Sequence, residues 1–145
     1  MYEHILLPTD GSEASLAAFD HALDLAERFG AAIDVLYVVD TDALPLDAHS
    51  QTVFEAADQA ARRTVADIVD RAEQREFERV TGEVREGSPT EVILDRADDP
   101  EVDLVVMGTH ARTGVERYLL GSVTERVVRT ASVPVLTVRG TNDAG

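Results

Sequence analysis

Short apolar runs alternate with longer stretches of mixed apolar and polar residues along nearly the whole chain. The runs at 4–8, 33–39 and 103–107 are largely apolar, which is typical of strands buried on both faces of a sheet. Weaker strand patterns occur at 79–85 and 133–138. Between the runs, apolar residues recur every three or four positions, as in a helix with one buried side. The pattern predicts an α/β domain with a five-stranded parallel sheet and helices on both faces.

Four stretches have the helical period. Ser12 is expected to cap the first helix and Gly30 to end it, because serine accepts backbone hydrogen bonds at helix starts and glycine tolerates the left-handed conformation at helix ends. The expected buried stripe of this helix is Ala18, Ala22, Leu25, Ala26 and Phe29. The second helix is predicted over 52–75, after a loop at 40–50, with a buried stripe of Ala57, Ala61, Val65, Ile68 and Ala72.

The other two helices are short. Ser88, Pro89 and Glu91 have the spacing of a capping box with proline at the first helical position, which predicts a helix over about 88–97. The last helix is predicted over about 122–130. In doubly wound sheets, ligands bind beyond the carboxyl ends of the strands, where the strand order reverses. If the first strand lies beside the fourth, the turn at 8–11 meets the loop that begins at Gly108.

The composition is that of one folded domain. The chain has 145 residues, of which 44% are apolar, and we expect a single domain over 1–140 with a frayed tail at 141–145. It has no cysteine and no apolar run long enough to span a membrane. Its first ten residues lack the pattern of a signal peptide. A cytoplasmic protein fits these features best.

Acidic residues strongly outnumber basic ones. The 28 acidic and 13 basic residues give a formal net charge of −15, which argues against nucleic acid as a partner. The excess favours solubility, and by analogy with halophilic proteins it suggests a high-salt cytoplasm. Any anionic ligand must therefore be held by local donors, against the field of the whole protein.

The loop from Gly108 to Ser122 is the strongest candidate for chemistry. It carries Arg112, Thr113 and Arg117, and it leads into a helix, so it could hold phosphate with backbone N–H groups and basic side chains. The alternative is that Ser122 only caps that helix, in a capping box with Glu125; both interpretations remain open. The sequence contains no dinucleotide or P-loop motif, no nucleophile elbow and no metal-ligand spacing of histidines.

Three segments of the sequence together resemble the universal stress protein family. They are Pro8-Thr9-Asp10, Gly108-Thr109-His110 and the run at 119–138. The resemblance implies a doubly wound, Rossmann-like sheet of order 3-2-1-4-5, and ATP held by a G-x₂-G-x₉-G-[ST] signature. That signature falls here on Gly108, Ala111, Gly121 and Ser122, so alanine replaces its second glycine.

The resemblance also implies which residues form the nucleotide site. Asp10 would accept hydrogen bonds from ribose hydroxyls, although it could equally form an Asx-turn. The backbone of Val38 would meet the adenine edge, and Val38 could also be an ordinary core valine. The full implied set is Pro8, Thr9, Asp10, Val38, Gly108, Thr109, Ala111, Arg112, Gly121, Ser122 and Val123.

The resulting functional prediction is a regulatory stress-response protein that binds ATP, or AMP or ADP, with or without Mg²⁺. The alternatives are an interaction protein that binds no nucleotide, which Ala111 favours, and a slow ATP hydrolase. No catalytic residue and no metal ligand are assigned, because no candidate base is apparent near the loop.

The apolar last strand, 133–138, would be an exposed sheet edge. Pairing with the same strand of a second copy would give a homodimer, unless a neighbouring loop covers that edge.

Overall fold

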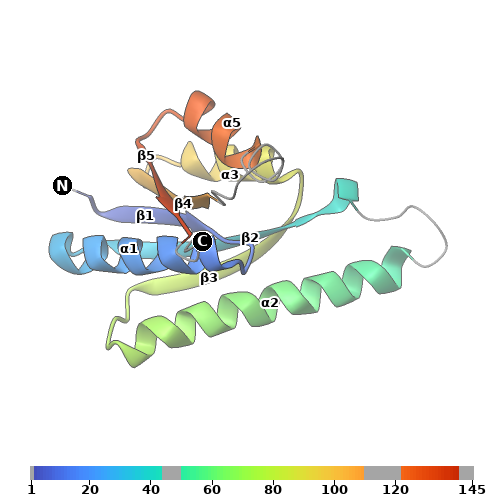
Figure 1. Ribbon diagram of the computed structural model, residues 1–145, viewed down its shortest axis with the longest axis horizontal. Coiled ribbons are helices and arrows are strands. Elements are labelled where there is room, and N and C mark those ends of the chain that lie inside the picture. The colour runs from blue at the N-terminus through green and yellow to red at the C-terminus, as the bar shows by residue number, and fades with distance from the viewer. Residues whose placement is uncertain (1, 44–49, 110–121, 141–145) are drawn as a thin grey trace.

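The chain folds into a five-stranded parallel sheet between two layers of helices (Figure 1). The computed structural model describes residues 2–43, 50–109 and 122–140. The strands are β1 (His4–Pro8), β2 (Ala32–Asp40), β3 (Val80–Gly87), β4 (Leu104–Thr109) and β5 (Val135–Arg139). Their order in the sheet is β3-β2-β1-β4-β5, and every neighbouring pair is parallel. The predicted fold class and strand order are confirmed.

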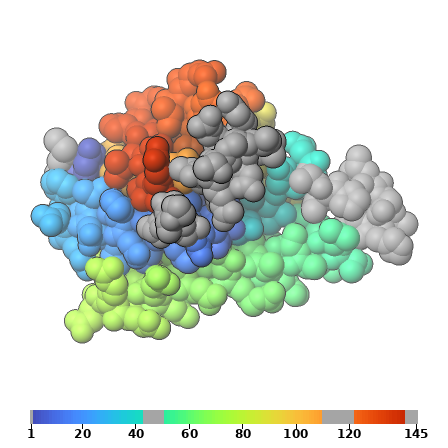
Figure 2. Space-filling model, viewed as in Figure 1, coloured from blue at the N-terminus to red at the C-terminus, as the bar shows by residue number. Residues whose placement is uncertain are grey.

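Among the described residues, two helices cover each face of the sheet. Helices α1 (Glu13–Phe29) and α2 (Ser50–Gln74) cover one face, and α3 (Pro89–Ala97) and α5 (Ser122–Thr130) cover the other. The space-filling view shows the same layers, with α1 and α2 in blue and green opposite α5 in orange (Figure 2). A short 3₁₀ helix, η1 (Thr41–Ala43), follows β2. Within the described residues, no helix is long and apolar enough to cross a membrane.

Strand β1 lies at the centre of the sheet and is buried on both faces. Ile5 and Leu7 pack against α1 and α2, whereas Leu6 packs against α3 and α5. This alternation follows from the period of two in a strand, in which successive side chains point to opposite faces. The continuous apolar run is therefore explained by two separate cores that share one strand.

The predicted caps of α1 are confirmed. Ser12 Oγ accepts a hydrogen bond from the backbone N–H of Ser15 at 3.2 Å, and Gly30 ends the helix in the left-handed conformation with φ of 71°. The predicted stripe is wrong at Phe29, which is 43% exposed. Phe29 is the last residue of the helix, and its ring packs edge-on against Tyr2 with 5.4 Å between centroids.

Several predicted boundaries differ from the structure. Helix α2 begins at Ser50, inside the stretch predicted as a loop, and β3 continues to Gly87 because it pairs with β2 along its whole length. Strands β4 and β5 end one or two residues later than predicted. The capping box at Ser88 is wrong, since its side chain makes no capping hydrogen bond. The start of α3 instead relies on Pro89, whose fixed φ suits the first helical position. The predicted tail at 141–145 lies outside the described residues.

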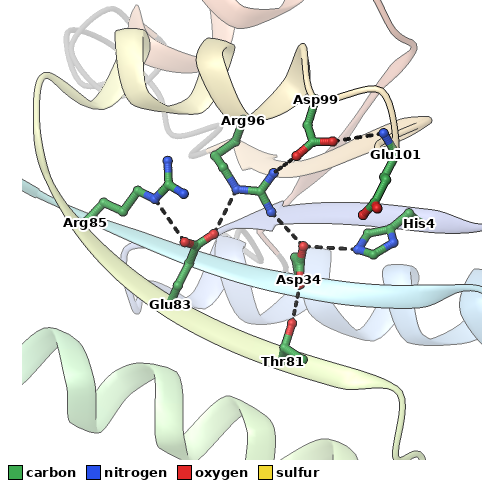
Figure 3. A network of polar contacts seen from close by, with 8 residues as sticks. All are labelled: His4, Asp34, Thr81, Glu83, Arg85, Arg96, Asp99 and Glu101. Atoms are coloured by element: carbon green, nitrogen blue, oxygen red, sulfur yellow. Dashed lines mark hydrogen bonds and ion pairs between the residues drawn. The ribbon is translucent and has the colours of Figure 1, made fainter.

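An ion-pair network links α3 to β2 and β3, toward the amino edge of the sheet (Figure 3). Arg96 Nη2 donates to Asp34 Oδ2 at 2.7 Å, and Arg96 Nε donates to Glu83 Oε2 at 2.8 Å. Arg96 Nη1 lies 3.4 Å from Asp99 Oδ2. The side chains of Arg96 and Asp34 are only 12% and 17% exposed, so solvent screens this pair less than a surface pair. The network fixes α3 relative to the sheet.

Asp34 is kept ionised at the centre of this network. Burial disfavours its charged form, but hydrogen bonds from Thr81 and His4 and the charges of His4 and Arg96 outweigh burial. The pKa of Asp34 is therefore lowered from its ordinary value. His4 Nε2 lies 3.1 Å from Asp34 Oδ2. These contacts explain why an acid occurs near the start of β2, among apolar residues.

Candidate functional site

A cavity of about 610 Å³ opens at the carboxyl edge of the sheet. It runs across the ends of β2, β1 and β4, which are neighbours in the sheet. The first turns of α3 and α5 and the N-terminal half of α2 complete its walls. Its volume falls within the range of roughly 300–1,000 Å³ that is usual for small-molecule sites. The cavity lies where strand order reverses in a doubly wound sheet, as the sequence predicted.

The structure brings six of the predicted site residues together in this cavity. They are Pro8, Thr9, Asp10, Val38, Gly108 and Val123. Thr109 ends β4 and Ser122 begins α5, and neither forms part of the cavity wall. Ala111, Arg112 and Gly121, with Thr113 and Arg117, lie outside the described residues.

The turn between β1 and α1 is held by hydroxyl groups. Thr9 Oγ1 donates to Ser15 Oγ at 2.9 Å, and Ser15 Oγ in turn donates to the backbone oxygen of Ser12 at 2.9 Å. The N–H of Gly11 donates to Thr9 Oγ1 at 3.2 Å. Thr9 and Ser15 are both buried. These bonds fix the floor of the cavity, because Thr9, Ser12 and Ser15 all line it.

Asp10 occupies the middle of this turn at the cavity wall. Its Oδ1 accepts a hydrogen bond from the backbone N–H of Ser12 at 2.9 Å, so the Asx-turn interpretation is confirmed. The residue is exposed, and a carboxylate has more acceptor positions than one such bond occupies. Asp10 lines the cavity, and the contact with ribose stays a prediction.

Gly108 has a packing role that the sequence did not reveal. A Cβ atom at this position would lie 2.4 Å from the backbone oxygen of Ala14 and 2.8 Å from the nitrogen of Ser15. The absence of a side chain therefore lets β4 approach the first turn of α1. Gly108 lies within β4, which ends at Thr109.

Helix α5 begins at the cavity because it is bound to β4. Thr124 Oγ1 donates to the backbone oxygen of Gly108 at 3.2 Å, and Thr124 is buried. Ser122 is the first residue of this helix, and Glu125 pairs with Arg129 at 2.8 Å. The predicted capping box of Ser122 with Glu125 stays a prediction. The first N–H groups of α5 carry a partial positive charge close to the cavity.

Apart from Val38, the residues at the β2 end of the cavity were not predicted from the sequence. Tyr37 and Asp40 of β2 line it together with Ala57 and Ala60 of α2. Burial raises the pKa of the Tyr37 phenol, and the charge of Asp10 raises it further. Asp40 carried a usable signal, since it comes at the end of an apolar run, and Asp10 likewise comes two residues after one. The alanines carried none, because small residues on a helix resemble an ordinary buried stripe.

The charges of the cavity wall are all negative within the described residues. Asp10 and Asp40 contribute carboxylates, and no lysine, arginine or histidine of the described part lines the cavity. No group of three or more acidic or histidine residues that could hold a metal ion occurs there either. The arrangement can hold an elongated ligand that places its anionic part at the start of α5 and its neutral part elsewhere.

Comparison with known proteins gives one consistent result. A model of the universal stress protein family matches residues 1–139. A universal stress protein of Methanocaldococcus jannaschii is 37% identical over 142 residues, which cover 96% of this chain and 83% of that protein.

Solved structures of similar proteins share the fold. The structure of UspA from Lactobacillus plantarum is 32% identical, covers 95% of this chain and 98% of its own, and superposes with a TM-score of 0.81. A family protein of Arabidopsis thaliana, solved with AMP bound, is 16% identical, with coverages of 97% and 94% and a TM-score of 0.69. At that identity the likeness is one of fold alone.

Proposed function

We propose that this chain, which belongs to the universal stress protein family, binds an adenine nucleotide in the cavity at the carboxyl edge of its sheet. The observation that carries the proposal is the convergence of Pro8, Thr9, Asp10, Val38, Gly108 and Val123 on one cavity. These residues come from three strands and a helix that are distant in sequence. AMP bound to the Arabidopsis thaliana relative supports adenine nucleotides as the ligand class.

The electrostatics of the cavity favour one orientation of the nucleotide. The start of α5 offers N–H groups and a partial positive charge to phosphate, and Val123 and Thr124 of its first turn line the cavity. Asp10, in the turn after the central strand β1, is suited to accept hydrogen bonds from ribose hydroxyls. The base then occupies the β2 end. ATP, ADP and AMP share this arrangement and differ only in the length of the phosphate chain, which Mg²⁺ would partly neutralise.

We further propose that nucleotide binding regulates a stress response through a homodimer. Strand β5 is an edge of the sheet, and Leu136 within it is 37% exposed. An apolar edge strand is a template for pairing with another chain. Pairing of the segment 133–138 with its copy would cover that edge in a two-fold arrangement. The acidic composition favours a high-salt cytoplasm as the setting.

The first test is whether the protein binds adenine nucleotide at all. Mass spectrometry of the ligand released on denaturation, followed by titration of the emptied protein with AMP and ATP, with and without Mg²⁺, measures this directly. We expect saturable binding. A folded protein that neither releases nor binds an adenine nucleotide would overturn the proposal and favour the interaction protein that binds no nucleotide.

Asp10→Asn tests whether binding occurs in this cavity. The amide keeps the acceptor for the Ser12 N–H but removes the charge, and we expect AMP affinity to fall by about tenfold because bonds to charged acceptors are the stronger ones. Asp67→Asn is the matched control, since Asp67 is an exposed residue of α2 that does not line the cavity. Equal affinities for the two variants would place the nucleotide elsewhere.

A further inference from the structure

We infer that Asp40 recognises the base of the nucleotide by accepting a hydrogen bond from an exocyclic amino group. The cavity would then favour adenine over hypoxanthine, which has an oxygen in place of the amino group. This inference rests on the proposed function, and it assigns base selection to the β2 end of the cavity.

The topology of the sheet gives the cavity two chemically different ends. Strand β2 lies on one side of β1 and β4 on the other, so the cavity extends from the end of β2 to the start of α5. Asp40 is the last residue of β2. Asp10 follows β1, in the middle. A ligand that places phosphate at α5 therefore presents its opposite end to Asp40.

The charge of Asp40 decides which chemical group can occupy that end. A carboxylate is only an acceptor of hydrogen bonds, and no cation of the described residues lines the cavity to offset it. Phosphate is repelled there, as is a carbonyl oxygen such as that of hypoxanthine. An amino group is a donor and satisfies the carboxylate.

The geometry of Asp40 leaves an oxygen for this role. Its Oδ1 accepts a hydrogen bond from the backbone N–H of Asp42 at 3.0 Å, at the point where β2 passes into η1. Among the described residues, no hydrogen bond reaches Oδ2. The bond from Asp42 holds the carboxylate in place, and Asp40 is half-buried at the cavity wall.

Small side chains on α2 leave room for a base at the β2 end of the cavity. The N-terminal turns of α2 project past the end of the sheet beneath the end of β2 (Figure 1), and Ala57 and Ala60, one turn apart, line the cavity. The half-buried Tyr37 contributes an aromatic surface to the same end. A flat, largely apolar ring with a polar edge fits these walls.

Calorimetric titration with AMP and inosine monophosphate tests the role of Asp40. We expect the wild-type protein to prefer AMP by about tenfold or more, because the half-buried Asp40 carboxylate accepts a hydrogen bond from the amino group of adenine but faces an oxygen in hypoxanthine. Asp40→Asn keeps the volume and the bond to Asp42, and its amide can donate to an oxygen, so the preference should fall toward unity. Asp42→Asn is the matched control, since Asp42 is exposed and outside the cavity wall.

The possible outcomes separate this inference from the proposed function. Wild-type binding of AMP with an unchanged preference in Asp40→Asn would overturn the role of Asp40 and leave nucleotide binding intact. Absence of binding by the folded wild-type protein would overturn both.

A second variant tests where the base lies without altering any charge. Ala57→Leu should weaken binding of AMP and inosine monophosphate alike, by about tenfold or more, because the added carbons occupy the space for the ring. Ala56→Leu is the control, since Ala56 is the exposed neighbour on the same helix and does not line the cavity. Circular dichroism checks that both variants fold. Wild-type affinity in Ala57→Leu would show that the base does not occupy the β2 end.

Discussion

Gly108 shows how a residue can suit a functional motif and still be required by packing. It lines the cavity, and its missing side chain is also what lets β4 lie against the backbone of Ala14. Thr124 binds its carbonyl oxygen, so the same residue fixes the start of α5. Gly108 therefore helps to position α1 and α5 whether or not a ligand is bound.

Gly108→Ala should therefore destabilise the protein even without ligand. The added Cβ would meet backbone atoms at less than 3 Å, which cannot move as a flexible side chain can, and overpacking of this kind costs about 1–3 kcal/mol. Urea denaturation of the ligand-free protein measures this. In Gly140→Ala, the matched control, the new Cβ would lie 3.5 Å from the nearest atoms of Ala14, and little change is expected. Equal stabilities would mean that the close approach at Gly108 is easily relieved.

At the scale of elements, α3 is held to the sheet by charge as well as by apolar packing. Ile93 and Ala97 contribute to the core, while Arg96 binds Asp34 of β2 and Glu83 of β3. The first turn of α3 meanwhile lines the cavity through Pro89 and Ile93. The ion-pair network at the C-terminal end of α3 therefore helps to hold in place the cavity wall that its N-terminal end forms.

The lowered pKa of Asp34 makes this attachment sensitive to acid. A carboxylate with a pKa lowered by folding contributes stability above its unfolded pKa, which is about 3.9 for an aspartate. It loses that contribution as pH falls through the folded pKa. Asp34→Asn should reduce the free energy of unfolding at pH 7 by about 1.5–3 kcal/mol, the usual value of a hydrogen bond to a charged group. The difference from wild type should shrink below pH 4. Urea denaturation between pH 2.5 and 7 checks this, and a difference independent of pH would contradict it.

At the scale of the whole molecule, the dominant electrostatic feature is a net charge of −15. Arg71 of α2 and Arg75, which directly follows α2, pair with acids of α1 at 3.6–4.0 Å. The side chains involved are 43–66% exposed, and such pairs stabilise proteins little. Most of the acidic surface therefore opposes the compact state through repulsion.

Salt should accordingly stabilise the fold. Raising KCl from 0.1 to 1 M shortens the screening length from about 10 Å to about 3 Å, which weakens repulsion among the surface carboxylates. We expect the midpoint of thermal unfolding to rise steadily over this range. Choline chloride serves as the control for a specific effect of potassium. A midpoint that falls or stays constant would argue against a high-salt setting.

The sequence by itself determined the alternating order of strands and helices, the caps at Ser12 and Gly30, and the turn at Asp10. These features depend on periodicity and on conformational preferences of neighbouring residues, which are local. Together with general rules of sheet topology, they predict a ligand site between β1 and β4. The resemblance to a family supplied the strand order and the identities of the site residues.

Only the tertiary structure decided which residues face one another across those elements. The pairing of Asp34 with Arg96, the contact of Gly108 with Ala14, and the convergence of Asp40 with Ala57 join positions far apart in the chain. Periodicity reveals which side of an element is buried, but it carries no information about what lies opposite. Only the packing of the chain brings such residues together. The same packing gives the cavity its two chemically different ends.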